Sequence, residues 1–296
     1  MRLNLDQLRS FLMVVRSGGV AKAAQALHVT QPAISARIRN LEETLGAQLF
    51  DREGGAMRLT KRGEMLLQYA GRLERLTQAI ERDIVDPSGI EGHIRIGASE
   101  TVAQSWLPDF VSALHARHPR VQIELNVDVS TNLRDGLLNR EIDLAFLLGP
   151  VSEQSVDNLA LPAFDLAWVV ATGTGGAPER LFDKPVITYA RGTRPFREIR
   201  DAVATRVGPD VPIFPSSSLS AAFRLVESGL GVAALPLTLA RPFLSSGRLD
   251  LFDPGWRPTP LSFTASYVAD PPSPIVVQAA ELARATADTA EGADPS

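Results

Sequence analysis

Residues 21–46 read AKAAQALHVTQPAISARIRNLEETLG, two helical patterns separated by a break at 28–30. Thr30 directly precedes the second pattern, where its hydroxyl can accept a backbone N–H as a helix N-cap. Pro32 falls in the first turn of that helix, where its missing N–H costs no hydrogen bond. The stretch therefore predicts a helix ending near residue 27 and another beginning at residue 31, the arrangement of a helix-turn-helix.

The second helix of this pair has an apolar side and a short polar side. Ile34, Ile38 and Leu41 fall together at helical spacing, which predicts the side that packs on the neighbouring helices. The opposite side holds Gln31, Pro32, Ser35, Ala36, Arg39 and Asn40. A flat polar face of this kind suits a helix that enters the major groove, where a glutamine amide can bind adenine. Many helical hairpins with this spacing bind nothing, so the spacing alone leaves DNA binding open.

The segments on either side complete a small domain. Before the pair, apolar residues recur at helical spacing from Leu8 to Val15, and Ser17-Gly18-Gly19 ends that helix. After it, a short strand near 49–50, a turn at 53–55 and a returning strand at 57–59 predict a hairpin. The hairpin carries a group of basic side chains, which are Arg52, Arg58, Lys61 and Arg62. A basic wing of this kind would grip phosphates and position the recognition helix without reading sequence.

The charge of the chain is unevenly distributed. Residues 1–62 hold 10 Lys and Arg against 5 Asp and Glu, although the whole chain of 296 residues has a net charge of −4. A basic head on an acidic body indicates that only the head meets a polyanion. The chain has no cysteine, which excludes disulfides, thiolate metal sites and a cysteine nucleophile. No leader-like start or long uncharged apolar run is found, so we expect a cytoplasmic protein without a membrane partner.

Two quoted segments carry a resemblance to a known family. AAQALHVTQPAISARIRNLEETLGAQLFDR, at 23–52, and RLTKRGEMLL, at 58–67, closely resemble the winged helix-turn-helix of LysR-type transcriptional regulators. The resemblance implies that Gln31, Pro32 and Ser35 face bases. It also implies that the DNA backbone is contacted by Thr30, Arg37, Arg39, Arg52 and Lys61. Members often have an arginine directly after the serine, whereas this chain has Ala36, so base preference is expected to differ.

The connector from 60 to 84 is strongly helical and stops at Asp86-Pro87-Ser88-Gly89. Leu59, Leu66, Leu73 and Ile80 recur every seven residues, with Tyr69 and Leu76 in two of the intervening positions. A helix lying on its own domain fits this pattern, and so does a self-pairing helix. The family resemblance implies the second, as a homodimer or a dimer of dimers on a pseudo-palindromic operator in double-stranded DNA.

From residue 90 the chain alternates short apolar strands with helices, which predicts an α/β fold with mainly parallel sheets. IDLAF at 142–146 and GLGVAALP at 229–236 support a resemblance to the two-lobed, periplasmic-binding-protein-like effector domain of the same family. We therefore expect a head at 1–62, a linker helix and hinge at 63–89, and an effector domain at 90–296. Lobe I is predicted at about 90–164 and 266–290, and lobe II at about 165–265.

A small-molecule effector is expected in the cleft between the lobes. Hydroxyls gather at the predicted strand-to-helix junctions, in the segments ASET, VST, YARGT and PSSS. The candidate effector residues are Ser99, Thr101, Ser130, Thr131, Arg191, Thr193, Ser216 and Ser217. Because helix N-termini favour anions, an organic anion is the hypothesis, with Arg191 or Arg194 as its countercharge. Each of these residues can also be an ordinary N-cap or turn residue.

Other functions have weaker signals. Gly229-Leu-Gly231-Val-Ala-Ala234 fits a dinucleotide fingerprint, but a helix precedes it and a strand follows, the reverse of what that motif requires. His115 and His118 are three residues apart, but a solvated helix end explains them better than a metal. No catalytic residue, metal site or cofactor is predicted. A solute-binding transport protein would suit the body, but not the head.

Overall fold

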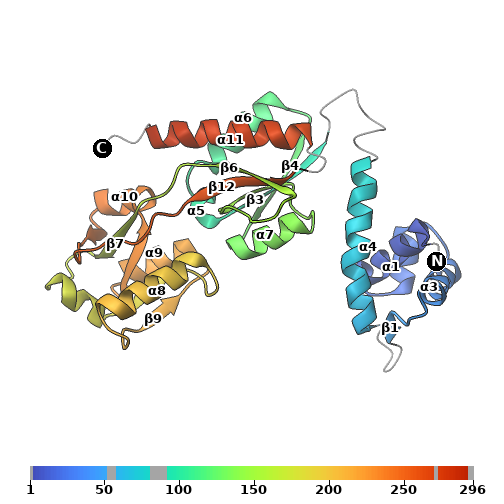
Figure 1. Ribbon diagram of the computed structural model, residues 1–296, viewed down its shortest axis with the longest axis horizontal. Coiled ribbons are helices and arrows are strands. Elements are labelled where there is room, and N and C mark those ends of the chain that lie inside the picture. The colour runs from blue at the N-terminus through green and yellow to red at the C-terminus, as the bar shows by residue number, and fades with distance from the viewer. Residues whose placement is uncertain (1–2, 52–57, 81–91, 270–272, 293–296) are drawn as a thin grey trace. The chain divides into compact units, whose positions relative to one another are not determined.

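The computed structural model describes residues 3–51, 58–80, 92–269 and 273–292, which fall into two compact units within Met1–Gly89 and Ile90–Ser296. The described part of the first unit has a simple element order (Figure 1). It runs α1 (Leu5–Ser17), α2 (Val20–Ala26), α3 (Gln31–Leu45), β1 (Phe50–Asp51), β2 (Arg58–Leu59) and α4 (Lys61–Ile80). The arginine predicted to contact DNA at position 52 lies outside the described residues.

The break between α2 and α3 lies where the sequence predicts it. His28 adopts a left-handed φ of 53°, and α3 begins at Gln31 with Pro32 in its first turn. Ile34, Ile38 and Leu41 are buried against α1 and α2, as expected. One prediction is wrong. Thr30 occupies the N-cap position with extended backbone, but its side chain makes no capping hydrogen bond, and its carbonyl accepts the N–H groups of Ala33 and Ile34 instead.

The hairpin and α4 meet at a point that only glycine permits. Phe50 pairs with Leu59 and Asp51 with Arg58 in antiparallel register. The Thr60 hydroxyl accepts the N–H of Gly63 at 3.0 Å. A Cβ on Gly63 would lie 2.2 Å from the carbonyl oxygen of Leu49, closer than any side chain could approach. Thr60 and Gly63 therefore fix how α4 leaves the hairpin.

The apolar stripe of α4 differs from the predicted heptad. Leu66 and Leu67 pack on the core of the head, and Glu74 Oε2 pairs with Arg16 Nη2 at 2.6 Å. Among the side chains of α4 that the structure describes, four apolar ones are more than a third exposed and share one side of the helix: Met65, Tyr69, Leu73 and Leu76. The seven-residue spacing predicts Leu66 in the exposed stripe, but the structure gives that place to Met65. The expected helix end at 84 lies outside the described residues.

Lobe I of the second unit is a five-stranded sheet covered on both faces. Its strand order is β4 (Gln122–Val127), β3 (His93–Ala98), β5 (Leu144–Leu148), β12 (Phe263–Val268) and β6 (Val156–Ala160). Leu144 and Phe146 face the core shared with α6 (Leu107–Arg117) and α11 (Pro274–Gly292). The intervening residues, Ala145 and Leu147, face α7 (Ser130–Leu138). Alternate residues of β5 thus face the two helical layers that lie on opposite sides of the sheet in Figure 1.

Lobe II repeats this plan with its own sheet. Its strand order is β11 (Leu249–Leu251), β7 (Leu166–Ala171), β10 (Val232–Pro236), β8 (Val186–Thr188) and β9 (Ile213–Pro215). One face packs on α9 (Leu219–Glu227) and α10 (Leu237–Ser245), and the other on α8 (Arg194–Arg206). Gly231 lies at the start of β10, where a Cβ would meet the carbonyl oxygen of Pro185 at 2.2 Å. Glycine therefore permits the close approach of the two backbones at this point.

The chain crosses between the lobes twice, after β6 and after β11. The two crossings are joined by an antiparallel bridge between Phe164 and Leu261, with N–O distances of 3.0 and 2.9 Å. The expectation of mainly parallel sheets is wrong, because both sheets are mixed. β12 is antiparallel to β5 and β6, and β7 is antiparallel to β10 and β11. β7 and β12 are the first strands that the chain forms after its two crossings.

Candidate DNA-binding face and effector cavity

The start of α3 presents a compact polar face. Gln31, Pro32 and Arg39 are exposed, and Ser35 and Ala36 are half-buried beside them. Thr30 is exposed next to them with a hydroxyl that caps no helix. These residues lie on α3 opposite its buried side, which packs on α1 and α2. Small side chains at 32, 35 and 36 let a DNA base edge come close to the helix.

Arg37 and Lys61, both assigned to the DNA backbone, have different surroundings in the structure. Arg37 is half-buried, and its Nη1 donates a hydrogen bond of 3.3 Å to the Ser10 hydroxyl of α1. Its side chain is thereby held toward the head, which leaves its other N–H groups for a phosphate. Lys61 is exposed at the first residue of α4, beside the hairpin.

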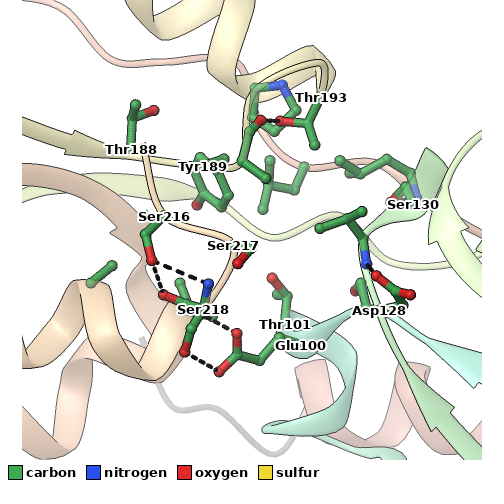
Figure 2. Close-up of a pocket in the computed structure, with 18 of the residues that line it drawn as sticks. Glu100, Thr101, Asp128, Ser130, Thr188, Tyr189, Thr193, Ser216, Ser217 and Ser218 are labelled. Atoms are coloured by element: carbon green, nitrogen blue, oxygen red, sulfur yellow. Dashed lines mark hydrogen bonds between the residues drawn. The ribbon is translucent and has the colours of Figure 1, made fainter. Parts of the chain in front are cut away.

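A cavity of about 270 Å³ lies between the two lobes (Figure 2). Six of the candidate effector residues line it: Ser99, Thr101, Ser130, Thr193, Ser216 and Ser217. Much of the remaining wall is apolar, with Val127, Leu148, Leu235 and Phe263 among its residues. A cavity this small, near the lower end of the roughly 300–1,000 Å³ of typical ligand sites, suits a small metabolite.

Several of these hydroxyls are engaged within the protein. Ser99 caps α5 (Glu100–Ala103) through the N–H of Val102, and the Ser130 hydroxyl accepts the N–H of Leu148 at 3.0 Å. Thr193 donates to the carbonyl oxygen of Ala190 at 2.7 Å and caps α8. The interpretation of these residues as N-caps and turns is therefore correct in part, and it does not remove them from the cavity wall.

Two lining hydroxyls that the sequence analysis missed have no hydrogen-bond partner among the described residues. Thr188 Oγ1 and the Tyr189 hydroxyl are both buried and unpaired. Burial raises the pKa of Tyr189, so its hydroxyl stays protonated. Buried polar groups normally have partners, so these two stand out among the residues that line the cavity. One sequence feature could have identified them. They lie at the carboxyl end of a buried parallel strand, where open α/β sheets bind ligands.

The described residues that line the cavity include neither lysine nor arginine. Arg191 is exposed, with its guanidinium 5.7 Å from the centre of the Phe196 ring, and it is not part of the cavity wall. Thr131 also lies outside this cavity and lines an adjoining recess together with Arg194. An anionic ligand held only by the cavity would therefore meet hydroxyls, N–H groups and the carboxylates of Glu100 and Asp128.

Glu100 joins the two lobes at one wall of the cavity. It lies on α5 of lobe I, and its carboxylate accepts hydrogen bonds from the N–H groups of Leu219 and Ser220 and from the Ser218 and Ser220 hydroxyls. These donors form the N-terminus of α9 in lobe II (Figure 2). Burial would raise the pKa of Glu100, but these hydrogen bonds outweigh it and hold the pKa below its ordinary value. Glu100 thus caps a helix of the opposite lobe.

The described residues hold no group of three or more His, Asp and Glu side chains placed to bind a metal ion. Within the same part of the chain, no helix combines the length and hydropathy needed to cross a bilayer.

Comparison with known families matches both parts of the chain. The family described as "Bacterial regulatory helix-turn-helix protein, lysR family" matches residues 5–64, and "LysR substrate binding domain" matches residues 87–288. The HTH-type transcriptional regulator YofA of Bacillus velezensis is 31% identical over 246 residues, which cover 83% of this chain and 85% of the relative.

Solved structures share the fold over nearly the full length. Full-length CbnR "complexed with the target DNA complex" has a TM-score of 0.68 at 22% identity, over 96% of this chain and 100% of CbnR. Full-length LysG from Corynebacterium glutamicum, "with bound effector Arg", has a TM-score of 0.64 at 18% identity, over 97% and 99%. At these identities the likeness establishes the architecture of the chain.

Proposed function

The chain belongs to the LysR family of transcriptional regulators, and from this premise we propose that α3 reads operator bases while a small molecule between the lobes sets the regulatory state. The exposed polar face at the start of α3 is the observation that carries the proposal. The chain acts as a sequence-specific DNA-binding regulator with an effector-binding domain, not as an enzyme. Because it works on an operator, we place it in the cytoplasm, where that DNA would be.

Base reading is assigned to the first turns of α3. Gln31 can offer its amide to adenine, Ser35 can donate or accept, and Pro32 can touch a thymine methyl group. Thr30, Arg39, Lys61 and the remaining N–H groups of Arg37 are assigned to the DNA backbone, which gives affinity that falls with salt. The arginine at position 52 is assigned to the same role. Ala36 adds a methyl group where an arginine is common in the family, so we expect a different base preference at that position.

The exposed side of α4 supports pairing of two chains. Met65, Tyr69, Leu73 and Leu76 leave an apolar stripe that a second copy of the helix could cover. Two heads would then present two recognition helices to a pseudo-palindromic site. We propose a homodimer, or a dimer of dimers, as the DNA-binding form, with the head at 1–62 and the linker helix and hinge at 63–89.

The cavity is proposed to hold the effector, by analogy with LysG, which carries a bound effector in its solved structure. Ser99, Thr101, Ser130, Thr193 and Ser217 line it, and Thr188 and Tyr189 supply unpaired hydroxyls. A ligand that contacts both lobes favours the arrangement in which these residues face each other. The difference between its affinity for that arrangement and its affinity for the alternative one is the free energy that can change how the heads bind DNA.

The base-reading assignment is tested by selecting binding sites from a pool of random duplexes. Wild-type protein should enrich a pseudo-palindromic sequence, and combining Gln31→Ala with Ser35→Ala should reduce discrimination against single-base changes about 10-fold or more. Lys61→Gln is the contrasting variant, which should weaken binding to all duplexes without changing their ranking. An unchanged ranking in the double variant would contradict the assignment of Gln31 and Ser35.

The effector assignment is tested by a thermal-shift screen of the full chain against small carboxylates and aromatic acids. A ligand present at about 100 times its dissociation constant should stabilise the protein by roughly 2.7 kcal/mol. A panel without a stabilising compound would count first against the organic anion as the effector class.

A further inference from the structure

A second recess, which we call the arginine hollow, opens beside the effector cavity. It has a volume of about 350 Å³ and shares Ser130, Leu148 and Thr193 with the cavity wall. Arg134 reaches it from α7 of lobe I, and Arg194 and Arg197 reach it from α8 of lobe II. Three arginines from two lobes therefore line a recess next to a cavity whose described wall contains no cationic side chain.

Only one of these arginines, Arg194, has a carboxylate within ion-pair distance among the described residues. Arg134 is exposed, and among the described residues no carboxylate oxygen lies within hydrogen-bonding distance of any of the three guanidinium groups. Arg194 forms an ion pair with Glu198, whose Oε1 lies 3.6 Å from its Nε, but that buried Nε has no hydrogen-bond partner among the described residues. Arg197 donates to the carbonyl oxygen of Gly192 at 2.8 Å. The hollow's own carboxylate, Glu153, leaves a net positive charge.

The two helices that bring these arginines add to the positive potential. The N-terminus of a helix carries a partial positive charge and normally attracts acidic residues. The first turn of α8 has no acidic residue and instead contains Arg194 and Arg197. The first turn of α7 also has no acidic residue, and its N-cap residue, Val129, has no side chain that can accept a hydrogen bond. Asp128, just before α7, accepts the N–H of Val129 at 2.7 Å, so the α8 end, with its two arginines, is the one better suited to binding an anion.

We propose that the arginine hollow binds the anionic group of the effector, a carboxylate or a phosphate, while the less polar part of the same molecule fills the cavity. Guanidinium groups bind both kinds of oxyanion in bidentate geometry. The effector is then a small molecule with a negative charge at one end and hydrogen-bonding groups that reach Thr188 and Tyr189. The inference rests on the proposed effector cavity. The countercharge of the effector is then supplied by Arg134, Arg194 and Arg197, and not by Arg191.

The experiment measures stabilisation of the full chain by inorganic phosphate, with sodium chloride at matched ionic strength as the reference. Arg134→Gln and Arg197→Gln each remove one charge from the hollow. Arg200→Gln is the matched control, because Arg200 is an exposed arginine on the same helix that lines neither recess. A parallel titration with sodium acetate tests whether a carboxylate occupies the hollow as phosphate does.

Phosphate should stabilise the wild-type chain and the Arg200→Gln variant at similar concentrations. In the two hollow variants the apparent dissociation constant should rise about 10-fold, the loss expected for a charge-assisted hydrogen bond. Arg134→Lys, which keeps the charge but not the bidentate fork, should fall between. An equal phosphate response in all five proteins would place the anion elsewhere, for instance on the basic head, and would overturn the proposal. So would the absence of any specific response to phosphate and acetate.

The same variants separate this inference from the proposed function. If a cavity ligand binds wild type and Arg134→Gln equally well, the effector cavity stands and the hollow is not its anion subsite. If the phosphate response depends on Arg134 and Arg197 but no small molecule of the panel engages Tyr189, the hollow stands and the effector cavity is in doubt.

Discussion

The hydroxyls of Thr188 and Tyr189 are buried without partners among the described residues, and this gives them an unusual mutational signature. Removing an unpaired buried hydroxyl relieves a desolvation cost, so Tyr189→Phe should leave the free energy of unfolding unchanged or raise it by up to about 1–3 kcal/mol. Effector affinity should change in the opposite direction and fall about 10-fold, because the ligand loses a hydrogen bond. Thermal unfolding and titration calorimetry of the same variant check both signs.

Ser216→Ala provides the comparison for this prediction. The Ser216 hydroxyl already donates to the carbonyl oxygen of Ser218 and accepts its N–H. Its loss should lower stability. A Tyr189→Phe protein that was destabilised and bound effector normally would show that the tyrosine hydroxyl serves folding.

The cavity residues also show which features of the site can be predicted from the sequence. The segments around Ser99, Thr193 and Ser217 can be selected as hydroxyl-rich junctions, and the structure places all three on one cavity. Which hydroxyls cap helices and which remain unpaired depends on distances that no local pattern contains. For the same reason the sequence misplaces Arg191. This residue is close to Thr193 in the sequence, but its guanidinium lies near the Phe196 ring, outside the cavity.

Glu100 links α5 of one lobe to the first turn of α9 in the other, so we expect it to stabilise their contact. Glu100→Gln keeps the shape but brings an NH₂ group to a set of donors, four from α9 and the Gln104 amide, and it should cost about 1–2 kcal/mol. Amide hydrogen exchange should accelerate at Leu219 or Ser220, because the glutamine amide keeps one acceptor oxygen and turns its NH₂ group toward the other N–H. Glu281→Gln, in an exposed pair with Arg284, is the control and should have little effect.

The pH dependence of this contact follows from the lowered pKa of Glu100. A carboxylate with a depressed folded-state pKa contributes its stability above the unfolded-state value and loses it as the pH falls through the folded-state value. The difference in unfolding free energy between wild type and Glu100→Gln should therefore be full near pH 7 and shrink below about pH 4.3, the ordinary pKa of a glutamate. A difference that stayed constant down to pH 3 would contradict a charged cap.

The exposed stripe of α4 carries the prediction about assembly. Burying a leucine contributes about 1.5–3 kcal/mol, and a two-fold interface contains each substitution twice. Leu76→Glu should therefore raise the dimer dissociation constant by about 100-fold or more, as measured by analytical ultracentrifugation. Leu251→Glu, at an equally exposed leucine of lobe II, should leave the subunit mass unchanged. If both variants assembled like wild type, the stripe would not be the contact between chains.

Elements differ in how well the sequence predicts them. The start of α3 follows from Pro32 and from the helical spacing of Ile34, Ile38 and Leu41, all of which act locally. The stripe of α4 is predicted less accurately, because Leu66 has suitable spacing for either the head or a partner. α10 escapes prediction because Pro242 lies inside it. β6 escapes because three of its five residues are exposed, so its apolar pattern is faint.

For the whole second unit, the alternation of strands and helices indicates an α/β fold, but not the direction of each strand. Direction depends on where the chain crosses between the lobes. β12 returns from lobe II and enters between β5 and β6 in antiparallel register, a placement that its apolar sequence alone does not specify. The same return brings Phe263 into the cavity wall, so the site is complete only in the assembled pair of lobes.

This return also sets an order of events during synthesis. Lobe II is built from one continuous stretch between β7 and β11, and it can fold as it emerges from the ribosome. The sheet of lobe I must wait, because β12 is an inner strand and α11 follows it near the end of the chain. The head, by contrast, precedes both lobes in the sequence. A nascent or truncated chain would thus have a finished DNA-binding head before it had any means of sensing a metabolite.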